Sequence, residues 1–389
     1  MNVKNLKGIN IVIVSTVPFF LVNQLSSHIY NLKEKGMQIT LVTSAGEELQ
    51  EFIEDDSIRV ITLEIARKIN PWVDLKALVF LIQLFARKKF TIMHSTTPKA
   101  GLLCAFAAKI TGIPLRLHTF TGQVWVTKTG FMRWMLQLFD KSIVRLNTYC
   151  YADSPSQQEF LIDSGIANKE NLSTYGKGSL AGVNLERFSQ RRFNEGYKYQ
   201  LRQRLGIEDD TFVLTFIGRL TREKGVFELL ASFEQIQVKF PRLHLIMLGP
   251  MEENDSAFLQ NKINSFSKIH WLGNVQEPER YLSITDILCL PSHREGFGTV
   301  VIEAAAMGVP TVGSKISGLS DAVEHGVTGI LVPLKNVNAF SESVEELFND
   351  INVLQEMKRA AKRRCEKYFD SKKVNEHVVQ EYIRLLNDM

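Results

Sequence analysis

Short apolar runs of strand length alternate with longer helix-like patterns along the whole chain. In the first half these runs lie at residues 9–14, 39–42, 60–63, 91–94, 115–119 and 149–152. The pattern then restarts with runs at residues 212–217, 243–248, 269–271, 287–290, 311–312 and 329–332. Strands that alternate with helices favour parallel sheets with helices on both faces. The sequence therefore predicts two doubly wound α/β domains, in which ligands bind at the carboxyl ends of the strands.

A polar stretch separates the two series of strands. Residues 184–210 are charged and poor in strand-forming side chains, and a length of 389 residues suits two domains. We predict an N-terminal domain over residues 1–184 and a C-terminal domain over residues 185–370. The last segment, residues 371–389, has the apolar periodicity of an amphipathic helix.

Composition narrows the class of protein. A net charge of +4 gives little support to nucleic-acid binding. The four cysteines are scattered and form no C-x-x-C pair, which favours reduced thiols in the cytoplasm. No apolar span reaches the roughly 18 residues of a membrane-spanning helix, and the N-terminal apolar run is too short for a signal peptide. We expect a cytoplasmic protein.

Two glutamates eight positions apart frame the most informative motif. Glu295 and Glu303 flank a Gly-Phe-Gly turn and an apolar run of good helix formers. A helix that begins near Gly298 would direct its free N–H groups at a phosphate, and the two carboxylates would suit sugar hydroxyls. The alternative is a capping Glu295 and a solvated Glu303, but Glu303 stands among apolar residues, where an unpaired carboxylate is costly. The motif indicates a nucleotide-sugar site, in which the backbone of Phe297, Gly298 and Thr299 covers the phosphate and sugar.

A basic turn follows the first strand of the second series. Gly218, Arg219 and Lys224 lie in the segment Gly-Arg-Leu-Thr-Arg-Glu-Lys-Gly. Two cations beside a permissive glycine can neutralise a diphosphate, both in a bound donor and as charge develops on the leaving group. An exposed basic turn is the alternative, and the position of this turn in the same domain as Glu295 favours the functional interpretation.

Two common nucleotide-site patterns are missing from the sequence. The first strand-to-helix turn has no G-x-G-x-x-G fingerprint, which counts against a nicotinamide or flavin enzyme. No Asp-x-Asp occurs, so a metal-held diphosphate is not expected. We expect neither a metal nor any other cofactor, since Arg219 and Lys224 would supply the positive charge that neutralises the diphosphate.

These motifs resemble those of the family 4 retaining glycosyltransferases. Residues 95–101, 117–125 and 176–184 resemble a bacterial group 1 subgroup that builds capsule, O-antigen and related surface polysaccharides. Glu295 and Glu303 resemble the family's E-x7-E motif, whose first Glu contacts the donor hexose and whose second binds the ribose. Arg219 and Lys224 resemble the element that grips the diphosphate, and Gly249 resembles the glycine of a turn beside the nucleotide.

The resemblance implies the GT-B fold, with two Rossmann-like domains that face each other across a cleft. It also implies that the helix at residues 371–389 packs back on the N-terminal, acceptor-binding domain. Many members of the family carry His-Gly near the transferred sugar, whereas this chain has Thr121-Gly122, with His118 three residues earlier. His118 therefore either contacts the donor or is a satisfied core histidine, and the sequence leaves both interpretations open.

The activity implied by the resemblance is retaining transfer of a hexosyl or N-acetylhexosaminyl group. The donor would be a UDP-sugar and the acceptor a saccharide on a polyprenyl diphosphate. A UDP-sugar 2-epimerase of the same fold is one alternative, although the N-terminal segments offer few carboxylates for acid–base chemistry. A non-catalytic nucleotide-sugar-binding subunit is the other, although Glu295, Glu303, Arg219 and Lys224 are all present.

A mixed aromatic, aliphatic and basic stretch at residues 125–141 raises the question of a membrane. Such a stretch can lie on an anionic membrane surface and receive a lipid-linked acceptor. An ordinary core helix with a cationic outer face fits equally well. The resemblance favours peripheral association with the inner face of the cytoplasmic membrane. Residues 75–85 are predicted to form a core helix.

Overall fold

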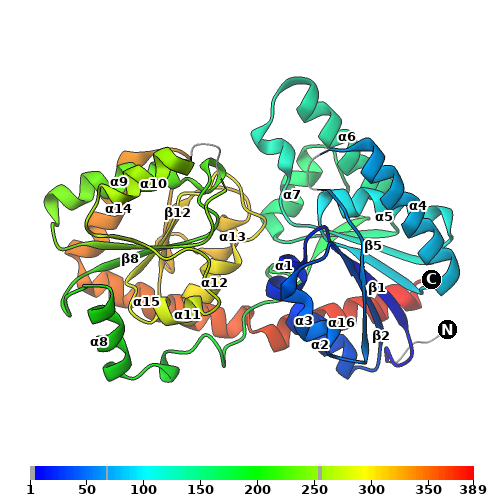
Figure 1. Cartoon of the computed structure of the whole chain (residues 1–389), viewed down its shortest axis with the longest axis horizontal. Coiled ribbons are helices and arrows are strands. Elements are labelled where there is room, and N and C mark those ends of the chain that lie inside the picture. The colour runs from blue at the N-terminus through cyan, green and yellow to red at the C-terminus, as the bar shows by residue number, and fades with distance from the viewer. Residues whose placement is uncertain (1–4, 67–68, 253–255) are drawn as a thin grey trace. The chain divides into compact units, whose positions relative to one another are not determined.

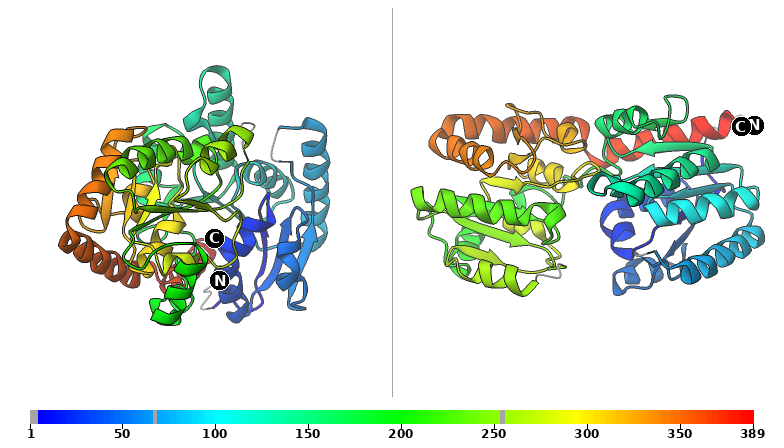
Figure 2. Two further views of the ribbon diagram at one scale, coloured as in Figure 1. Left: turned by 60° about the vertical axis from the view of Figure 1, so that its left-hand side comes forward. Right: turned by 90° about the horizontal axis from the view of Figure 1, so that it is seen from above.

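A computed structural model describes residues 5–66, 69–252 and 256–389 (Figure 1). The described chain forms two compact units. Unit 1 comprises Met1–Gly182 and Ser371–Met389, and unit 2 comprises Val183–Asp370. Figures 1 and 2 show helices against both faces of each sheet. In the described ranges no helix is both long and apolar enough to cross a membrane.

Unit 1 contains a parallel sheet of seven strands in the order β3-β2-β1-β4-β5-β6-β7. Alternate residues of its central strands point to opposite faces, so Ile11 and Ile13 pack with one core cluster while Val12 and Val14 pack with another. The strands are β1 (Asn10–Val14), β2 (Gln38–Thr43), β3 (Ile58–Thr62), β4 (Ile92–Ser95), β5 (Leu115–Phe120), β6 (Tyr149–Ala152) and β7 (Leu172–Thr174).

The helices of unit 1 divide between these two faces. Side chains of α2, α3 and α16 join one core cluster, and those of α4 and α5 join the other. The main helices are α2 (Ser26–Glu34), α3 (Gln50–Ile53), α4 (Pro71–Lys88), α5 (Pro98–Ile110), α6 (Gly130–Leu146), α7 (Pro155–Asp163) and α16 (Ser371–Asn387). Shorter turns are α1 (Pro18–Phe20), η1 (Leu21–Leu25), η2 (Glu47–Leu49) and η3 (Val124–Thr127).

Unit 2 contains a parallel sheet of six strands in the order β10-β9-β8-β11-β12-β13. The strands are β8 (Val213–Ile217), β9 (His244–Leu248), β10 (Ile269–Trp271), β11 (Ile287–Leu290), β12 (Thr311–Ser314) and β13 (Gly329–Val332). The helices are α8 (Glu195–Arg204), α9 (Val226–Lys239), α10 (Ser256–Asn264), α11 (Pro278–Leu282), α12 (Thr299–Ala306), α13 (Leu319–Ala322), α14 (Val337–Asn349) and α15 (Ile351–Tyr368), with short turns η4 (Gln190–Arg192) and η5 (Arg222–Lys224).

Each sheet has a point at which the strand order reverses. In unit 1 it lies between β1 and β4, and in unit 2 between β8 and β11. The loops that follow two such strands diverge to opposite faces of the sheet, which leaves a crevice for a ligand at their carboxyl ends. The sequence motifs of the second half follow β8 and β11, so the fold puts them at such a crevice.

The two units divide at Gly182 and Val183, whereas the sequence suggested a boundary after residue 184. Val183 lies in unit 2 because its N–H donates to the Phe369 carbonyl (2.7 Å) and its side chain joins the unit 2 core. The sequence analysis missed β7, a strand of three residues at the sheet edge. So short a run has too few apolar residues to stand out from a loop.

Candidate active site

The loops after β8 and β11 are joined along their length. The backbone N–H of His293 donates to the Glu223 carbonyl (2.8 Å), and the Arg294 guanidinium pairs with the Glu223 carboxylate (3.0 Å). Farther along, His293 Nε2 lies 2.8 Å from Glu228 Oε1. Gly225 makes this approach possible, because a Cβ there would lie 2.0 Å from the carbonyl oxygen of Pro291. Two motifs far apart in the sequence thus form one local structure.

The central contact of this structure joins Lys224 to Glu295. Lys224 Nζ lies 2.6 Å from Glu295 Oε1, and the two side chains are 23% and 10% exposed. Such a pair keeps an ammonium and a carboxylate side by side, both accessible from the crevice. The ammonium can bind a diphosphate and the carboxylate can accept hydrogen bonds from sugar hydroxyls.

The glycine-rich turn leads from Glu295 into α12. Gly298 precedes the helix with a φ of 85°, in the left-handed region, and a Cβ there would lie 2.7 Å from Leu319 Cδ2. No side chain caps the helix. Phe297 is buried and packs against Phe369, with ring centroids 5.2 Å apart. Phe297 and Gly298 can therefore offer a ligand only their backbone groups, and Thr299 is the first residue of the helix.

Three further predicted residues lie at the ends of β8 and β9. Gly249 has a φ of 134°, and a Cβ there would lie 2.0 Å from the carbonyl oxygen of Gly218. Only glycine fits this close backbone approach. Arg219, next to Gly218, pairs through Nη1 with Glu252 Oε2 at 2.7 Å. The structure thus places Gly218, Arg219 and Gly249 together, with Arg219 in a different ion pair from Lys224.

Glu303 lies one turn inside α12 and is half-buried. Within the described ranges its carboxylate has no hydrogen-bond or ion-pair partner. Burial raises its pKa to about 7, while the positive charge of Arg187 opposes that rise and Glu279 adds to it. A carboxylate among apolar residues needs a partner, as the sequence analysis argued. Since Glu303 has none within the described ranges, its carboxylate is available to bind a ligand.

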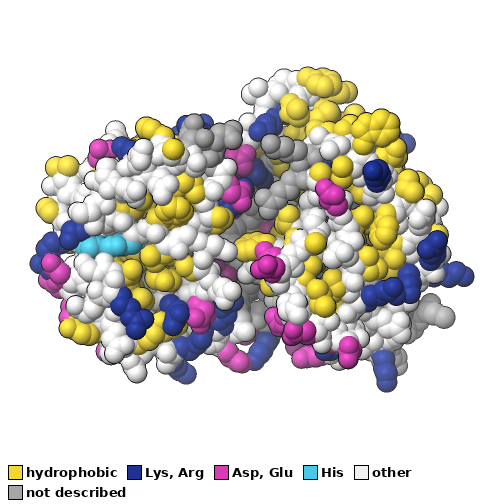
Figure 3. All heavy atoms as spheres, viewed as in Figure 1, with side chains coloured by type: hydrophobic (Ala, Val, Ile, Leu, Met, Phe, Trp, Pro, Cys, Tyr) yellow, Lys and Arg dark blue, Asp and Glu magenta, His cyan; other side chains and the backbone are white. Residues whose placement is uncertain are grey.

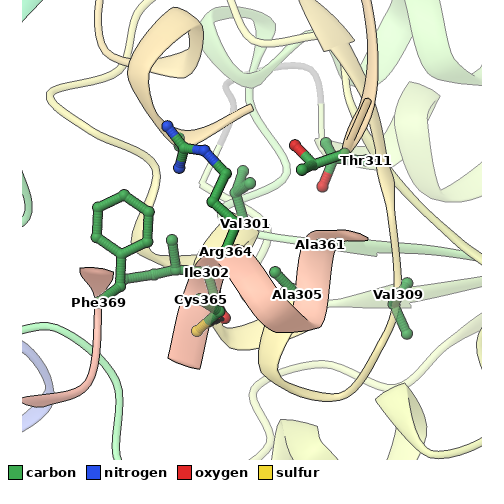
Figure 4. A pocket seen from close by; sticks show the side chains of 11 residues that line it. Val301, Ile302, Ala305, Val309, Thr311, Ala361, Arg364, Cys365 and Phe369 are labelled. Carbon is green, nitrogen blue, oxygen red and sulfur yellow. Dashed lines mark hydrogen bonds between the residues drawn. The ribbon is translucent and has the colours of Figure 1, made fainter. Parts of the chain in front are cut away.

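A small cavity of about 10 Å³ lies beside α12, and Figure 4 shows its lining. Val301, Ile302 and Ala305 line it from the helix, and Arg364 lines it from α15. At about 100° per residue, Val301 and Ala305 lie on the opposite side of α12 from Glu303, and Ile302 lies about 100° from it. The cavity therefore belongs to the packing of α12 on α15 rather than to the crevice.

The last predicted catalytic residue, His118, lies in unit 1. It is 1% exposed on β5, accepts or donates a hydrogen bond with Ser95 Oγ (3.0 Å), and stacks edge-on with Phe120. A Cβ on Gly101 would lie 2.4 Å from its ring, and burial lowers its pKa to about 3. These features favour the core-histidine interpretation that the sequence left open.

The corresponding loops of unit 1 are joined by hydroxyl groups. Thr97 Oγ1 accepts from the N–H of Thr16 (2.9 Å) and lies 2.7 Å from Thr16 Oγ1. Ser44 Oγ donates to the Thr16 carbonyl (2.9 Å), and Thr121 Oγ1 donates to the Thr96 carbonyl (3.2 Å). The crevice edge of unit 1 is thus polar but uncharged at these positions.

The sequence analysis did not single out several residues of the unit 2 site. Glu223, Glu228, His293 and Arg294 flank the predicted residues and hold the two loops together. Their position in the two motifs or within three residues of them was the available signal. Arg187 had no such signal, because nothing in the sequence pairs it with Glu279, 92 residues later on α11.

Two family models match the chain. One is described as "Glycosyl transferase 4-like domain" and matches residues 24–172. The other is described as "Glycosyl transferases group 1" and matches residues 198–364, which include every predicted residue of the unit 2 site.

Full-length similarity extends these matches. The chain is 31% identical over 394 residues to "Capsular polysaccharide biosynthesis glycosyltransferase CapM" of Staphylococcus aureus, with 99% of each protein covered. It is 25% identical over 326 residues to the "UDP-Gal:alpha-D-GlcNAc-diphosphoundecaprenol alpha-1,3-galactosyltransferase" of Escherichia coli, with 82% of each covered. The crystal structure of Anabaena Alr3699/HepE in complex with UDP and glucose has a TM-score of 0.80 at 18% identity, over 96% of this chain and 99% of that one. The predicted fold class, GT-B with two Rossmann-like α/β domains, is confirmed.

Proposed function

The chain belongs to the group 1 glycosyltransferases, and from this premise we propose that it transfers a hexosyl or N-acetylhexosaminyl group from a nucleotide sugar to a saccharide, with retention. The observation that carries the proposal is the 2.6 Å contact between Lys224 and Glu295. It joins a cation that suits a diphosphate to a carboxylate that suits a sugar, at the carboxyl ends of two neighbouring strands.

Each group at the crevice has a role in this proposal. Lys224 and Arg219 bind the diphosphate, and the backbone at residues 297–299 covers the phosphate and sugar. Glu295 binds the hexose and Glu303 the ribose. The two cations carry the charge that a metal ion carries in other transferases, so we expect activity without an added metal.

The reaction would proceed on one face of the sugar. The bond from the anomeric carbon to the phosphate oxygen breaks while a bond to the acceptor oxygen forms on the same side, and the acceptor proton passes to the leaving phosphate. Lys224 stabilises the negative charge that develops on that phosphate. Donor binding must therefore draw the ammonium of Lys224 from Glu295 to the diphosphate, which frees the carboxylate for the hexose.

The nature of donor and acceptor rests on relatives. The E. coli relative is named for UDP-galactose and for a saccharide on diphosphoundecaprenol, and the Anabaena structure contains UDP and glucose. We therefore propose a UDP-sugar donor and a polyprenyl-diphosphate-linked acceptor. The S. aureus relative is named for capsular polysaccharide biosynthesis, which supports a role in bacterial surface polysaccharides.

A lipid-linked acceptor requires access to a membrane. Three neighbouring helices of unit 1 have a surface that suits binding to a membrane. Exposed apolar side chains gather on α4, α5 and α6, and Figure 3 shows them where Figure 1 labels α4 and α6. Trp72 is 77% and Phe131 is 73% exposed. The other members are Leu75, Val79, Phe80, Phe106, Ile110, Met132, Trp134 and Leu138. We call this surface the apolar face.

The charges on these helices match an anionic bilayer. The three helices carry eight basic and two acidic residues. Both acids are already engaged, since Asp74 pairs with Lys99 (2.9 Å) and Asp140 is buried and accepts from Trp125 Nε1 (2.8 Å). Exposed aromatic residues among an excess of cations are typical of helices that lie in a membrane interface. We therefore propose peripheral binding through the apolar face.

The outer side of α4 differs from the sequence-based expectation. The prediction of a core helix at residues 75–85 holds for Ala77, Leu81 and Phe85, which are buried. Leu75 and Val79 are instead about half exposed, because α4 is the outermost helix on its face of the sheet. The helix thus has apolar residues both on the side that packs on the core and on the side that is exposed.

The experiment that tests the function is a panel of nucleotide sugars, with release of free nucleotide followed by mass spectrometry. Wild type, Glu295→Gln and Lys224→Ala are compared with and without a membrane lipid extract as acceptor source. The proposal predicts turnover of one donor that requires the extract and is lost in both variants. Turnover without acceptor would indicate the 2-epimerase, and UDP binding without any turnover would indicate the binding subunit.

A further inference from the structure

The N-terminal end of α6 is exposed on all sides. Residues 126–134, which lead into the helix and form its beginning, are all exposed. Phe131 and Trp134 lie in this stretch with ring centroids 5.7 Å apart, and both belong to the apolar face. Figure 1 shows this end of α6 projecting from the rest of unit 1, and Figure 3 shows hydrophobic side chains on it. The part of α6 that suits a membrane is thus held in place by residues outside it.

The first buried side chain of α6 belongs to Asp140. Its Oδ2 accepts a hydrogen bond from Trp125 Nε1 (2.8 Å), and Trp125 is 1% exposed. A buried carboxylate is costly without a donor, so the packing of α6 depends on this contact. Two turns earlier on the helix, the Arg133 guanidinium lies 5.3 Å from the centroid of the Trp125 ring. Trp125 therefore contacts α6 at two points, one in its exposed end and one at its first buried residue.

Trp125 is in turn fixed to the core of unit 1. Its ring stacks on Phe160 of α7, with ring centroids 5.2 Å apart and 20° between the two planes. It also packs in the core cluster that contains Phe120, the last residue of β5. Stacked aromatic pairs add to the stability that comes from the area they bury. The Trp125 ring therefore cannot move without disturbing the packing of β5 and α7.

Only three residues separate Trp125 from the crevice edge of unit 1. Thr121 Oγ1 donates to the Thr96 carbonyl (3.2 Å), which joins the loop after β5 to the loop after β4. Gly122 and Gln123, which follow Thr121, are buried. So short and packed a link leaves little room for independent movement, because protein interiors are close-packed. A shift of Trp125 is therefore passed on to the crevice edge.

We propose that Trp125 is a positioning residue for the lipid-linked acceptor: held by Asp140 and Phe160, it fixes the membrane-binding end of α6 relative to the crevice edge of unit 1. A saccharide on a polyprenyl diphosphate is tethered to the bilayer, so it reaches the crevice only where the protein holds that edge at a matching height. The inference rests on the proposed function, which supplies the lipid-linked acceptor and the membrane-binding apolar face.

An ordinary core tryptophan would stabilise unit 1 whatever the form in which the acceptor is offered. A positioning residue differs, because its effect depends on whether the acceptor is held in a bilayer. The lipid extract that serves as acceptor source can be reconstituted in vesicles of phosphatidylglycerol and phosphatidylcholine, or dissolved in detergent. In detergent the acceptor diffuses to the crevice without the help of α6.

The test compares kcat/KM for these two forms of the acceptor. Trp125→Phe removes the Nε1–H donor and Asp140→Leu removes its acceptor, so both break the hydrogen bond. Each should lower kcat/KM about tenfold with vesicles and less than about twofold in detergent. The double variant should be no worse than either single variant, because both remove the same contact.

Two control variants separate positioning from stability. Asp140→Asn keeps an oxygen that can accept from Trp125, so it should restore the wild-type ratio between vesicles and detergent. Phe90→Leu changes a buried ring that precedes β4 and packs edge-on with Phe85, at the opposite end of the strands from the crevice. It should lower both values alike. A loss in Trp125→Phe that is equal for both forms of the acceptor would overturn the inference.

A second readout needs neither donor nor acceptor. Hydrogen–deuterium exchange is measured with and without vesicles, and vesicle flotation reports binding. In wild type, bound vesicles should slow amide exchange at residues 121–125 as well as in α6. In Trp125→Phe, vesicles should bind equally well but slow exchange in α6 alone. Slower exchange at residues 121–125 in both proteins, or in neither, would overturn the inference. Failure of wild type to bind vesicles would instead contradict the proposed membrane binding on which the inference rests.

Discussion

The two units share one architecture but equip their crevice edges in opposite ways. In unit 2 the loops after β8 and β11 are joined by ion pairs, Lys224 with Glu295 and Arg294 with Glu223. In unit 1 the loops after β1 and β4 are joined by the hydroxyls of Thr16 and Thr97. Charge suits a nucleotide diphosphate and neutral hydroxyls suit a saccharide. The side chains at the point of strand reversal, rather than the reversal itself, therefore decide whether a crevice suits a donor or an acceptor.

The largest expected effect tests the charged edge. Lys224→Ala removes the ammonium that we propose stabilises charge on the leaving phosphate, and kcat/KM should fall about 10²–10³-fold. Steady-state transfer assays measure it. Lys239→Ala is the control, because Lys239 forms an exposed ion pair with Glu345 elsewhere in unit 2. Equal losses in both variants would show that the effect is not specific to the crevice.

The next prediction concerns the outer surfaces of the units. Trp72→Ser combined with Phe131→Ser should weaken binding to vesicles of phosphatidylglycerol and phosphatidylcholine about a hundredfold, because each aromatic residue that enters the interface contributes about 1.5–3 kcal/mol. Vesicle flotation measures the bound fraction. Val238→Ser, at an apolar residue of unit 2 that is 80% exposed, should change nothing. If Val238→Ser weakens binding as much, the apolar face of unit 1 has no special role.

A third prediction uses the buried histidines of unit 1. Burial lowers the pKa of His118 to about 3 and that of His28 to about 4, so both rings are neutral in the folded unit. In the unfolded chain these histidines take up protons below about pH 6.5. The free energy of unfolding therefore falls as the pH falls below that value. The loss is about 2 kcal/mol per histidine at about pH 5. Urea unfolding of His118→Gln should show a flatter acid dependence than wild type. His377→Gln, at an exposed histidine of the same unit, should match wild type.

The smallest expected effect separates the two ion pairs of the charged edge. Arg219 and Glu252 are 42% and 33% exposed, and an ion pair so exposed contributes about 0–1 kcal/mol. Glu252→Gln should therefore change the KM for the donor by less than about fivefold. Transfer assays at a series of donor concentrations measure this KM. A loss as large as that in Lys224→Ala would show that Glu252 takes part in the site.

The sequence was enough to predict the two strand series and the pairing of charge with carboxylate, because both depend on local patterns. Lys224 and Glu295 could be placed together, since each follows a central strand of one sheet. The ion pair of Arg187 with Glu279 could not be predicted, because it depends on how a loop folds over α11. The environment of His118 was equally hidden, since the approach of Gly101 to its ring exists only after α5 packs on β5.

The most direct test of the account compares UDP binding with sugar transfer in Glu295→Gln. Glu295 Oε1 lies 2.6 Å from the ammonium of Lys224, so neutralising Glu295 should free that cation for the diphosphate. The account predicts UDP affinity equal to or tighter than that of wild type, together with a fall in transfer of about 10²–10³-fold. Transfer at the wild-type rate would contradict the role of Glu295 at the sugar and with it the proposed donor site.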